Sequence, residues 1–570
     1  MIFLKQTYIA LMDQALGAYS EEHIRRYFED VQKNGLTEHG FPRLTANIGI
    51  LISFGKRGYL KPIFMEMMEF CCKNIPNVRA ANDFSVREIV SCIAEIEKSG
   101  MIDEEIIARW KDYLSGINPF TCYNVFAKSP TDKVKNWALF TAVGEFFRKK
   151  MGLGGSDDFI DTQIASQLQW LDENGMYMDE RGAIHHPMVY DLVPRALFAM
   201  LLHAGYRGQY YQAIDSALKR AGLLTLQMQS PNGEVAFGGR SNQFLHNEPW
   251  MIAIYEYEAR RYAAEGNMAL AGVFKSVIKR AIRVTEEWLY REPTLHIKNR
   301  FPIESMYGCE NYAYFDKYMI TTASVLFSAY QICDDSIPEN EECDRKPTAF
   351  MTSKHFHKLF LKAHGYGLEF DLNADPHYDA TGLGRVHREN APAAICLSVP
   401  CPNDPRYAVD LPNPIALSLC PGVLCNGEWI FANDSEAKYE VQSLPCHDIS
   451  ACAELRCVFS DGKNLISEYT VGADGVRIEV SGADDIAYQV PAFYFDGETY
   501  TVIESAETTL CVSYRGWKCR YTTDGKIIDN RKMGANRNGY YKSYMAVSKK
   551  KLSLTVEILK LTAQADVIKS

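Results

Sequence analysis

The sequence predicts an α+β multidomain protein, in which an N-terminal (α/α) toroid of about a dozen helices is followed by a C-terminal antiparallel β-sandwich. Three observations predict this class. The chain has 570 residues, which is more than one ordinary domain. Apolar residues recur three and four positions apart in the first part, and alternate with polar residues in the second. A charged stretch separates the two patterns, so we expect a toroid over 1–335, a linker over 336–348 and a sandwich over 349–570.

The helical pattern is present throughout the first part. It covers 5–18, 21–33, 44–55, 59–74, 86–98, 103–115, 134–150, 156–171, 188–204, 209–227, 248–264, 268–290 and 315–333. Ser20 and Ser85 are expected to cap the helices that follow them. Short connections rich in Gly, Pro and Asn indicate paired helices that wind into a closed ring or a solenoid. No repeat of fixed period is visible, which disfavours a regular solenoid.

The second part contains short segments rich in Val, Ile, Tyr and Thr, separated by turns such as Ser460-Asp461-Gly462. Many strands with little helix predict an antiparallel sandwich. The predicted strands include KLFLKAHGYGLEFDLN, AAICLSV, GEWIFA, AELRCVFS, LISEYTV, VRIEVSG, AYQVPAFYF, YTVIES, TLCVSY, YKSYMAVS and LSLTVEIL.

Composition limits the partners. The net charge is −10 and no Lys/Arg block stands out, so we expect no nucleic acid. No run of about 18 apolar residues is present, so we expect no membrane span. The 16 cysteines are scattered without CxxC pairs, and the N-terminal stretch does not resemble a signal peptide, so we expect free thiols and a cytoplasmic protein. We expect no cofactor and no metal, since no phosphate loop, HExxH or GxSxG motif occurs.

The densest polar stretch is 231–258, a Gly-rich loop that leads into a helix. Asn242 and His246 are four residues apart, so they would share one face of a helix. Their side chains can donate hydrogen bonds to a carboxylate or an enolate, and Arg240 can bind an anion through two hydrogen bonds. The alternative interpretation is a polar loop that caps the helix. Other substrate-binding candidates in this stretch are Gln243 and Glu248.

Three further stretches gather polar and aromatic side chains. Tyrosine can transfer a proton when a neighbouring cation lowers its pKa, or it can stack on a sugar; ordinary packing is the alternative for each of them. The stretch 296–318 offers Tyr307, Tyr312, Tyr314, Arg300 and Glu310. The stretch 366–389 offers Arg385 and His387. The stretch 172–195 offers His186 and Tyr190, together with Asp179 as a candidate acid or base. Trp137 is a candidate sugar platform, and weaker candidates are Glu38, His39, Arg43 and Asn136.

The domain order resembles that of the heparinase II/III-like and alginate-lyase-like polysaccharide lyases, which pair an (α/α) toroid with a C-terminal β-sandwich. In such lyases a toroid Asn or His neutralises the uronate carboxylate, while a later Tyr and a sandwich His handle protons. The resemblance gives the first role to Asn242 or His246. It gives the others to one of Tyr307, Tyr312 and Tyr314, and to His387 in GRVHRENAPAAICLSV.

A second resemblance is to toroid-fold exo-β-glucuronidases. It rests on NWALF at 136–140, QWLDENGMYMD at 169–179, SPNGEVAFGGRS at 230–241 and DKYMITTASVLF at 316–327. Both families act on uronic acids, but they differ in the reaction. Elimination needs donors that neutralise the carboxylate together with an acid and a base, whereas hydrolysis needs two carboxyl groups that flank the bond.

The sequence therefore predicts a carbohydrate-active enzyme that cleaves uronic-acid-containing saccharides by β-elimination. The alternatives are an exo-acting β-glucuronidase-type hydrolase and a non-catalytic glycan-binding protein. The expected partner is a uronic-acid oligosaccharide, and a homodimer is left open.

Overall fold

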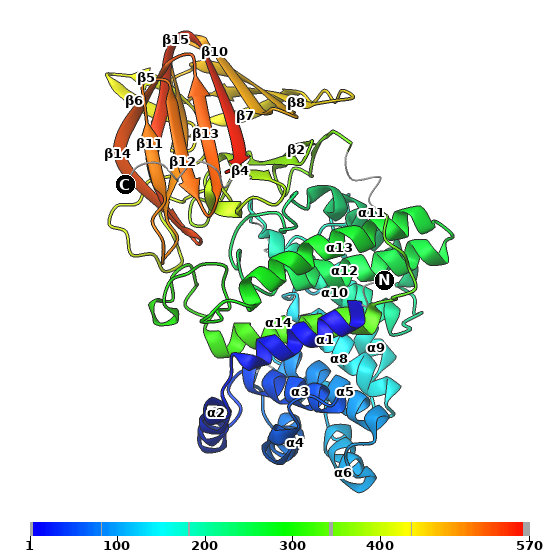
Figure 1. The fold of residues 1–570 in the computed structure, drawn as a ribbon. Helices are drawn as coiled ribbons and strands as arrows, with labels where there is room; N and C mark the ends of the chain where they lie inside the picture. The colour runs from blue at the N-terminus through cyan, green and yellow to red at the C-terminus, as the bar shows by residue number, and fades with distance from the viewer. Residues whose placement is uncertain (1–3, 81, 180–182, 341–345, 435, 562–570) are drawn as a thin grey trace.

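The computed structural model describes residues 4–80, 82–179, 183–340, 346–434 and 436–561. The helices form one body and the strands form a second body that lies against one side of it (Figure 1). The predicted order of a helical domain followed by an antiparallel β-domain is confirmed.

Six helices form a closed inner ring. Each packs against the next along the chain, and the last packs against the first. Three of these helices are buried on nearly every side, as expected of helices enclosed by others; they are α3, α10 and α12. The ring consists of α3 (Gly40–Ser53), α5 (Asn82–Ser99), α8 (Trp137–Lys150), α10 (Met188–His203), α12 (Asn247–Ala264) and α14 (Phe315–Ile332).

The remaining helices surround this ring, so the predicted toroid is confirmed. Helix α1 packs on α14, α4 on α3, α9 on α8, and both α11 and α13 on α12. The outermost helix α2 buries one stripe, Ile24, Phe28 and Val31, as a surface helix does. These helices are α1 (Leu4–Gly17), α2 (Glu21–Asn34), α4 (Lys61–Asn74), α6 (Glu104–Ser115), α7 (Pro119–Cys122), α9 (Asp157–Leu168), α11 (Tyr211–Met228) and α13 (Met268–Leu289).

One of the two predicted helix caps is confirmed and the other is wrong. The Ser20 hydroxyl accepts a hydrogen bond from the His23 amide, 3.1 Å away, at the start of α2. Ser85 does not cap α5, because that helix begins three residues earlier and buries Ser85 inside its first turn. The first two residues of this helix are polar, so the apolar pattern did not indicate the earlier start. One of them, Asp83, is held by tertiary contact: its carboxylate accepts a hydrogen bond from the amide of Val125, 2.8 Å away.

The sandwich consists of a four-stranded and an eleven-stranded sheet, which share one hydrophobic core. The smaller sheet runs β1 (Thr348–Met351), β2 (Lys358–Ala363), β3 (Tyr366–Asp371) and β4 (Gly382–Arg388). The larger sheet has the order β11-β12-β13-β15-β10-β9-β8-β7, with β14 on β15 and the β5–β6 hairpin on β10. Its strands are β5 (Pro421–Cys425), β6 (Glu428–Phe431), β7 (Lys438–Ser443), β8 (Ala451–Val458), β9 (Asn464–Gly472), β10 (Gly475–Phe495), β11 (Val502–Ser505), β12 (Thr509–Tyr514), β13 (Trp517–Thr523), β14 (Lys526–Asn536) and β15 (Gly539–Lys560).

Three strand predictions differ from the structure. AAICLSV is a short 3-10 turn, Ala393–Ile395, followed by a single bridge between Val386 and Leu397. Its apolar residues are buried in the core although they form no strand. A short apolar run in a sequence does not distinguish a buried strand from a buried irregular segment. VRIEVSG and AYQVPAFYF are parts of one strand, β10, whose register against β15 shifts between Ser481 and Asp485. YKSYMAVS and LSLTVEIL are likewise parts of one strand, β15.

The helical domain ends with α14 at Ile332, and the first strand begins at Thr348. Part of the predicted linker, 341–345, lies outside the described residues. None of the described helices combines the length and the hydropathy that a bilayer crossing requires.

Candidate active site

The inner helices contribute the residues that line one cavity of about 850 Å³, here called the ring cavity. Each inner helix supplies residues from its start: His39 and Arg43 from α3, Phe84 from α5, Trp137 from α8, Tyr190 from α10, His246 from α12 and Lys317 from α14. The first turn of a helix carries partial positive charge from its unpaired amides. Six such ends directed at one cavity favour a bound anion.

The charged side chains of the ring cavity are mostly cationic. Its described lining holds five cationic side chains and one carboxylate, that of Asp179. A local excess of positive charge attracts an anionic substrate even though the whole chain is acidic. The five cationic residues are Arg43, Lys133, Lys135, Arg240 and Lys317.

Asp179 is already engaged by two neighbours. It accepts a hydrogen bond from Asn136 Nδ2, 2.6 Å away, and it forms an ion pair with Arg240. The guanidinium of Arg240 also lies over the ring of Tyr190, 4.7 Å from its centroid. These contacts fix the direction of Arg240 at the edge of the cavity.

Three hydroxyl groups form a chain beside Arg240. Tyr190 Oη lies 3.1 Å from Ser241 Oγ, and Ser241 Oγ lies 3.0 Å from Tyr312 Oη. Burial raises the pKa of Tyr312 far above its usual value, and the neighbouring Tyr190 and Glu310 raise it further. Tyr312 therefore carries its proton in the free protein. The hydrogen bond with Ser241 and the charge of Arg240 act in the opposite direction on its pKa, and they favour release of the proton to a strongly basic leaving oxygen.

His246 is buried and lies directly before α12, which begins at Asn247. Asn242 lies in the preceding loop, so the prediction that Asn242 and His246 share one face of a helix is wrong. The ring of His246 stacks on Phe244 and lies 5.3 Å from the ring of Tyr318, which is itself 6.2 Å from the ring of Tyr312. Burial lowers the pKa of His246 to about 3, and the positive charge of Arg43 acts in the same direction. Its Nδ1 has no hydrogen-bond partner among the described residues. The imidazole is therefore neutral and can accept a proton.

This buried histidine gives a prediction about stability. As the pH falls below about 6.5, the unfolded chain protonates His246, whereas the folded chain resists protonation until the pH approaches about 3. Folded-state stability is therefore lost on acidification, by up to about 1.4 kcal/mol per pH unit for one such histidine. Urea unfolding at pH 7 and pH 5 should show a smaller loss for His246→Gln than for wild type. The control variant His447→Gln changes an exposed histidine, and its loss of stability between pH 7 and pH 5 should equal that of wild type. Equal losses of stability in His246→Gln and His447→Gln would contradict the prediction.

The loop that carries Ser241 is held in place by the sandwich. Ser241 and Gln243 have φ angles of 58° and 64°, a left-handed conformation that is unfavourable for these residue types. The Ser241 amide donates to Glu310 Oε1, 2.6 Å away. Glu310 in turn pairs through both oxygens with Arg537, at 2.7 and 3.0 Å, at the turn between β14 and β15. The sandwich thus positions a loop of the toroid cavity.

With this geometry described, the chain can be compared with known proteins. It is similar to the solved structure of a heparan sulfate lyase HepC mutant from Pedobacter heparinus, with a TM-score of 0.49 and 8% identity over 91% of this chain and 76% of that one. It is similar to heparinase III, with a TM-score of 0.39 and 8% identity over 84% and 77%. It is also similar to the chondroitin lyase ODV-E66, a baculovirus envelope protein, with a TM-score of 0.21 and 9% identity over 76% and 78%.

These neighbours include the lyase group that the sequence resembles. No family model matches the sequence, and no curated protein matches it. At these identities the similarity concerns the fold alone, and the chemistry of the ring cavity follows from its own residues.

The structure brings nine of the predicted candidates together in the lining of the ring cavity: His39, Arg43, Asn136, Trp137, Asp179, Tyr190, Arg240, His246 and Tyr312. It also separates the three tyrosines that the sequence left open. Tyr307 is stacked on Phe301 with ring centroids 3.6 Å apart, at the junction of the domains. Tyr314 lies in a smaller hollow beside Glu38.

Other predicted residues form contacts outside the lining. Asn242 and Gln243 hydrogen-bond to each other at 3.0 Å, next to Ser241. Glu248 pairs with Lys298 at 2.7 Å, and Glu310 with Arg537 as described. Arg385 pairs with Glu369 at 3.0 Å and Arg300 with Glu498 at 3.2 Å. His387 is buried within β4, where burial and the nearby Arg385 lower its pKa well below the usual range.

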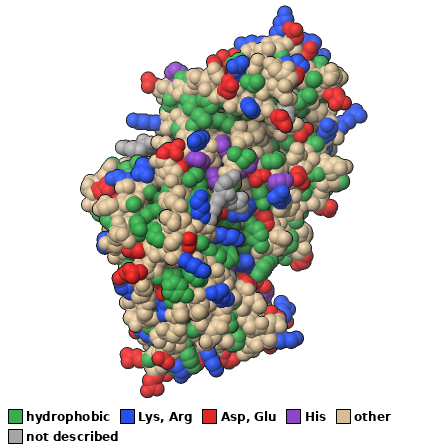
Figure 2. Space-filling view, turned by 180° about the vertical axis from the view of Figure 1, so that it is seen from behind, with side chains coloured by type: hydrophobic (Ala, Val, Ile, Leu, Met, Phe, Trp, Pro, Cys, Tyr) green, Lys and Arg blue, Asp and Glu red, His purple; other side chains and the backbone are tan. Residues whose placement is uncertain are grey.

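His186 belongs to a group of four histidines where the two domains meet. Its ring centroid lies 6.2 Å from that of His355, and the rings of His185 and His357 are also 6.2 Å apart. Burial lowers the pKa of His186 to about 4. Histidines gather near the middle of the face drawn in Figure 2, among Lys and Arg side chains. No group of three His, Cys, Asp or Glu within the described ranges has the arrangement of a metal site.

Several lining residues were missed by the sequence analysis: Lys133, Lys135, Ser241, Trp250, Lys317 and Thr321. Most of them lie just before an inner helix or in its first two turns. The signal that could have found them is the alternation of inner and outer helices, because it identifies which helix starts meet at one end of the ring.

Proposed function

We propose that the chain is a lyase that cleaves a uronic-acid-containing saccharide by β-elimination, with the ring cavity as its active site. The observation that carries this proposal is the composition of the described lining. It combines a protonated tyrosine, Tyr312, and a neutral imidazole, His246, with an excess of cations. The fold resemblance to polysaccharide lyases agrees with this proposal.

The reaction requires the carboxylate of the uronate to be neutralised before the proton at C5 can leave. Arg240 and Lys317, together with the starts of the inner helices, are suited to hold that carboxylate. We assign the acceptance of the C5 proton to His246. Its low pKa in the free protein is expected to rise when the negative substrate binds beside it.

The remaining steps follow from the electron balance. As the C5 proton moves to His246, the electron pair of the C5–H bond becomes the C4=C5 double bond, and the bond from C4 to the glycosidic oxygen breaks. That oxygen leaves with a negative charge and takes the proton of Tyr312. Ser241 Oγ, 3.0 Å from Tyr312 Oη, is placed to stabilise the resulting tyrosinate.

Hydrolysis is less well supported by the same lining. A hydrolase of the common kind needs two carboxyl groups on either side of the scissile bond. Among the described lining residues only Asp179 has a carboxylate, and Asn136 and Arg240 already bind it.

Asp179→Asn separates the two reactions. In a lyase the variant loses an ion pair that orients Arg240, so we expect kcat/KM to fall by about tenfold or less, mainly through KM. If Asp179 were a hydrolytic acid or base, kcat would fall by about a hundredfold or more. The steady-state kinetics of the purified variant distinguish these results, with the exposed Asp30→Asn as a control for handling.

The product identifies the reaction directly. The protein is incubated with a panel of uronic-acid oligosaccharides while the ultraviolet absorbance of a C4=C5 double bond is followed, and the products are weighed by mass spectrometry. An absorbing product without added water is expected. A saturated uronic acid that has gained one water would overturn the proposal in favour of hydrolysis.

A further inference from the structure

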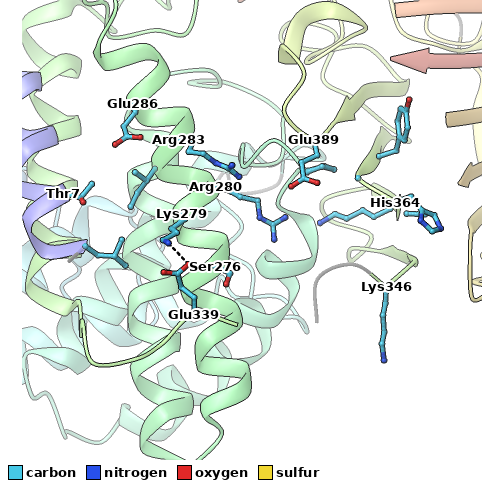
Figure 3. Close-up of a pocket in the computed structure, with 17 residues that line it drawn as sticks. Thr7, Ser276, Lys279, Arg280, Arg283, Glu286, Glu339, Lys346, His364 and Glu389 are labelled. Atoms are coloured by element: carbon cyan, nitrogen blue, oxygen red, sulfur yellow. Dashed lines mark ion pairs between the residues drawn. The ribbon is translucent and has the colours of Figure 1, made fainter. Parts of the chain in front are cut away.

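A second pocket of about 390 Å³ lies between the toroid and the sandwich, and we call it the junction pocket. One wall comes from α13 and the start of α1, and the other from the turn between β2 and β3. It shares no lining residue with the ring cavity. Figure 3 shows Arg280 and Arg283 directed from α13 toward the side on which His364 and Glu389 lie.

The junction pocket carries an excess of positive charge. Its described lining has five cationic side chains, Lys279, Arg280, Arg283, Lys346 and Lys362, and three carboxylates, Glu286, Glu339 and Glu389. Lys279 pairs with Glu339 at 2.6 Å (Figure 3). The difference between the two counts leaves a formal excess of two positive charges in the lining.

The cationic groups of the junction pocket repel one another, and Lys362 shows this repulsion. Its ammonium donates to the carbonyl oxygen of Gln229, 2.5 Å away. Burial and, to a smaller extent, repulsion from Arg280 lower the pKa of Lys362 to about 7. Two cationic groups are thus held on the same cavity, and a bound anion would relieve their repulsion.

We propose that the junction pocket binds a compact tetrahedral oxyanion, a sulfate or phosphate ester, on a molecule the size of a sugar. The planar guanidinium of Arg283 suits the oxygens of such a group, and Lys362 contributes a point charge from the opposite wall. A sulfate ester carries one negative charge and a phosphate monoester close to two at neutral pH, and both are opposite in sign to the formal excess in the lining. The cavity volume is in the range of small-molecule sites.

The position of the pocket gives the ligand a structural effect. Because its walls belong to both domains, a bound ester would connect α13 with the β2–β3 turn. A ligand that binds only the folded protein raises the stability according to its concentration relative to its Kd. We therefore expect binding to raise the melting temperature without any change at the ring cavity.

Binding is measured by calorimetry and by thermal melting with three probes: glucose 6-sulfate, glucose 6-phosphate and glucose. The sugar esters are used at millimolar concentration and at constant ionic strength, because sulfate salts at high concentration stabilise proteins without a site. The variants are Arg283→Gln, on an exposed position of α13, and Lys362→Met. The matched control is Lys33→Gln, an exposed cation on α2 that lines neither cavity.

At least one sugar ester is expected to bind saturably, and glucose is not. Arg283→Gln and Lys362→Met should each weaken that binding about tenfold, and Lys33→Gln should leave it unchanged. The ester that binds more tightly identifies sulfate or phosphate as the recognised group. Absence of saturable binding, or binding that both pocket variants retain, would overturn the proposal. None of these measurements depends on the activity of the ring cavity, and Arg283→Gln is informative even if Lys362→Met fails to fold.

Discussion

Replacing Tyr312 with Phe should lower kcat by about 10²- to 10⁴-fold, because the variant loses the hydroxyl that supplies a proton to the leaving oxygen. The aromatic ring stays, and Ser241 keeps its hydrogen bond to Tyr190 at 3.1 Å, so the cavity walls should persist. The rate of C4=C5 formation under saturating substrate is the measurement. An unchanged KM with a reduced kcat would indicate loss of an interaction made in the transition state.

The chain offers two matched controls for this substitution. Tyr314→Phe changes a hydroxyl in the smaller hollow, and Tyr307→Phe changes a buried hydroxyl at the domain junction that has no partner among the described residues. Both should retain nearly full kcat. A large loss in Tyr314→Phe with normal turnover in Tyr312→Phe would show that the wrong tyrosine has been assigned.

Replacing Arg537 with Gln should have the largest effect on stability, a loss of about 3–5 kcal/mol in the free energy of unfolding. Glu310 is 2% exposed, and the substitution leaves its charge buried without its cation. The Ser241 amide depends on the same carboxylate, so kcat should fall as well, although Arg537 does not line the ring cavity. Urea unfolding and steady-state kinetics measure the two effects.

Arg515→Gln provides the comparison for this ion pair. Arg515 pairs with Asp496 at 3.3 Å but is more than one third exposed, so its removal should cost about 1 kcal/mol or less. A double variant, Arg537→Met with Glu310→Gln, should recover part of the stability because no unpaired charge remains. Equal costs for Arg537→Gln and Arg515→Gln would contradict the view that the sandwich holds the Ser241 loop.

Most of the fold could be predicted from the sequence, because burial on one side imposes a visible period. The stripe of Ile24, Phe28 and Val31 predicts α2 without any knowledge of its neighbours. The start of α5 could not be predicted, because Asp83 accepts hydrogen bonds from amides about forty residues later in the chain. Rules for helix caps use only residues close in the sequence, and they select Ser85.

The candidate site was predictable only in part, and for a related reason. The polar stretch 231–258 contains Arg240 and His246, which line the ring cavity, but also Glu248, whose charge is neutralised by Lys298. Residue type and spacing do not distinguish a side chain that faces a cavity from one that pairs with a partner brought near by folding. The missed residues Lys133, Lys135 and Lys317 also lie in polar stretches, where lysines are ordinarily exposed, so the sequence does not mark them as lining a cavity.

The arrangement of the inner helices also separates the molecule into two ends with different tolerance to change. All six helices begin at the ring cavity, so their last turns lie at the far end. Several of those turns are closed by glycines with positive φ: Gly55, Gly100, Gly152, Gly205 and Gly266. Peptide insertions, affinity tags or fluorescent labels placed in these turns would lie a full helix length from the ring cavity, which makes the turns natural attachment points for engineering this scaffold.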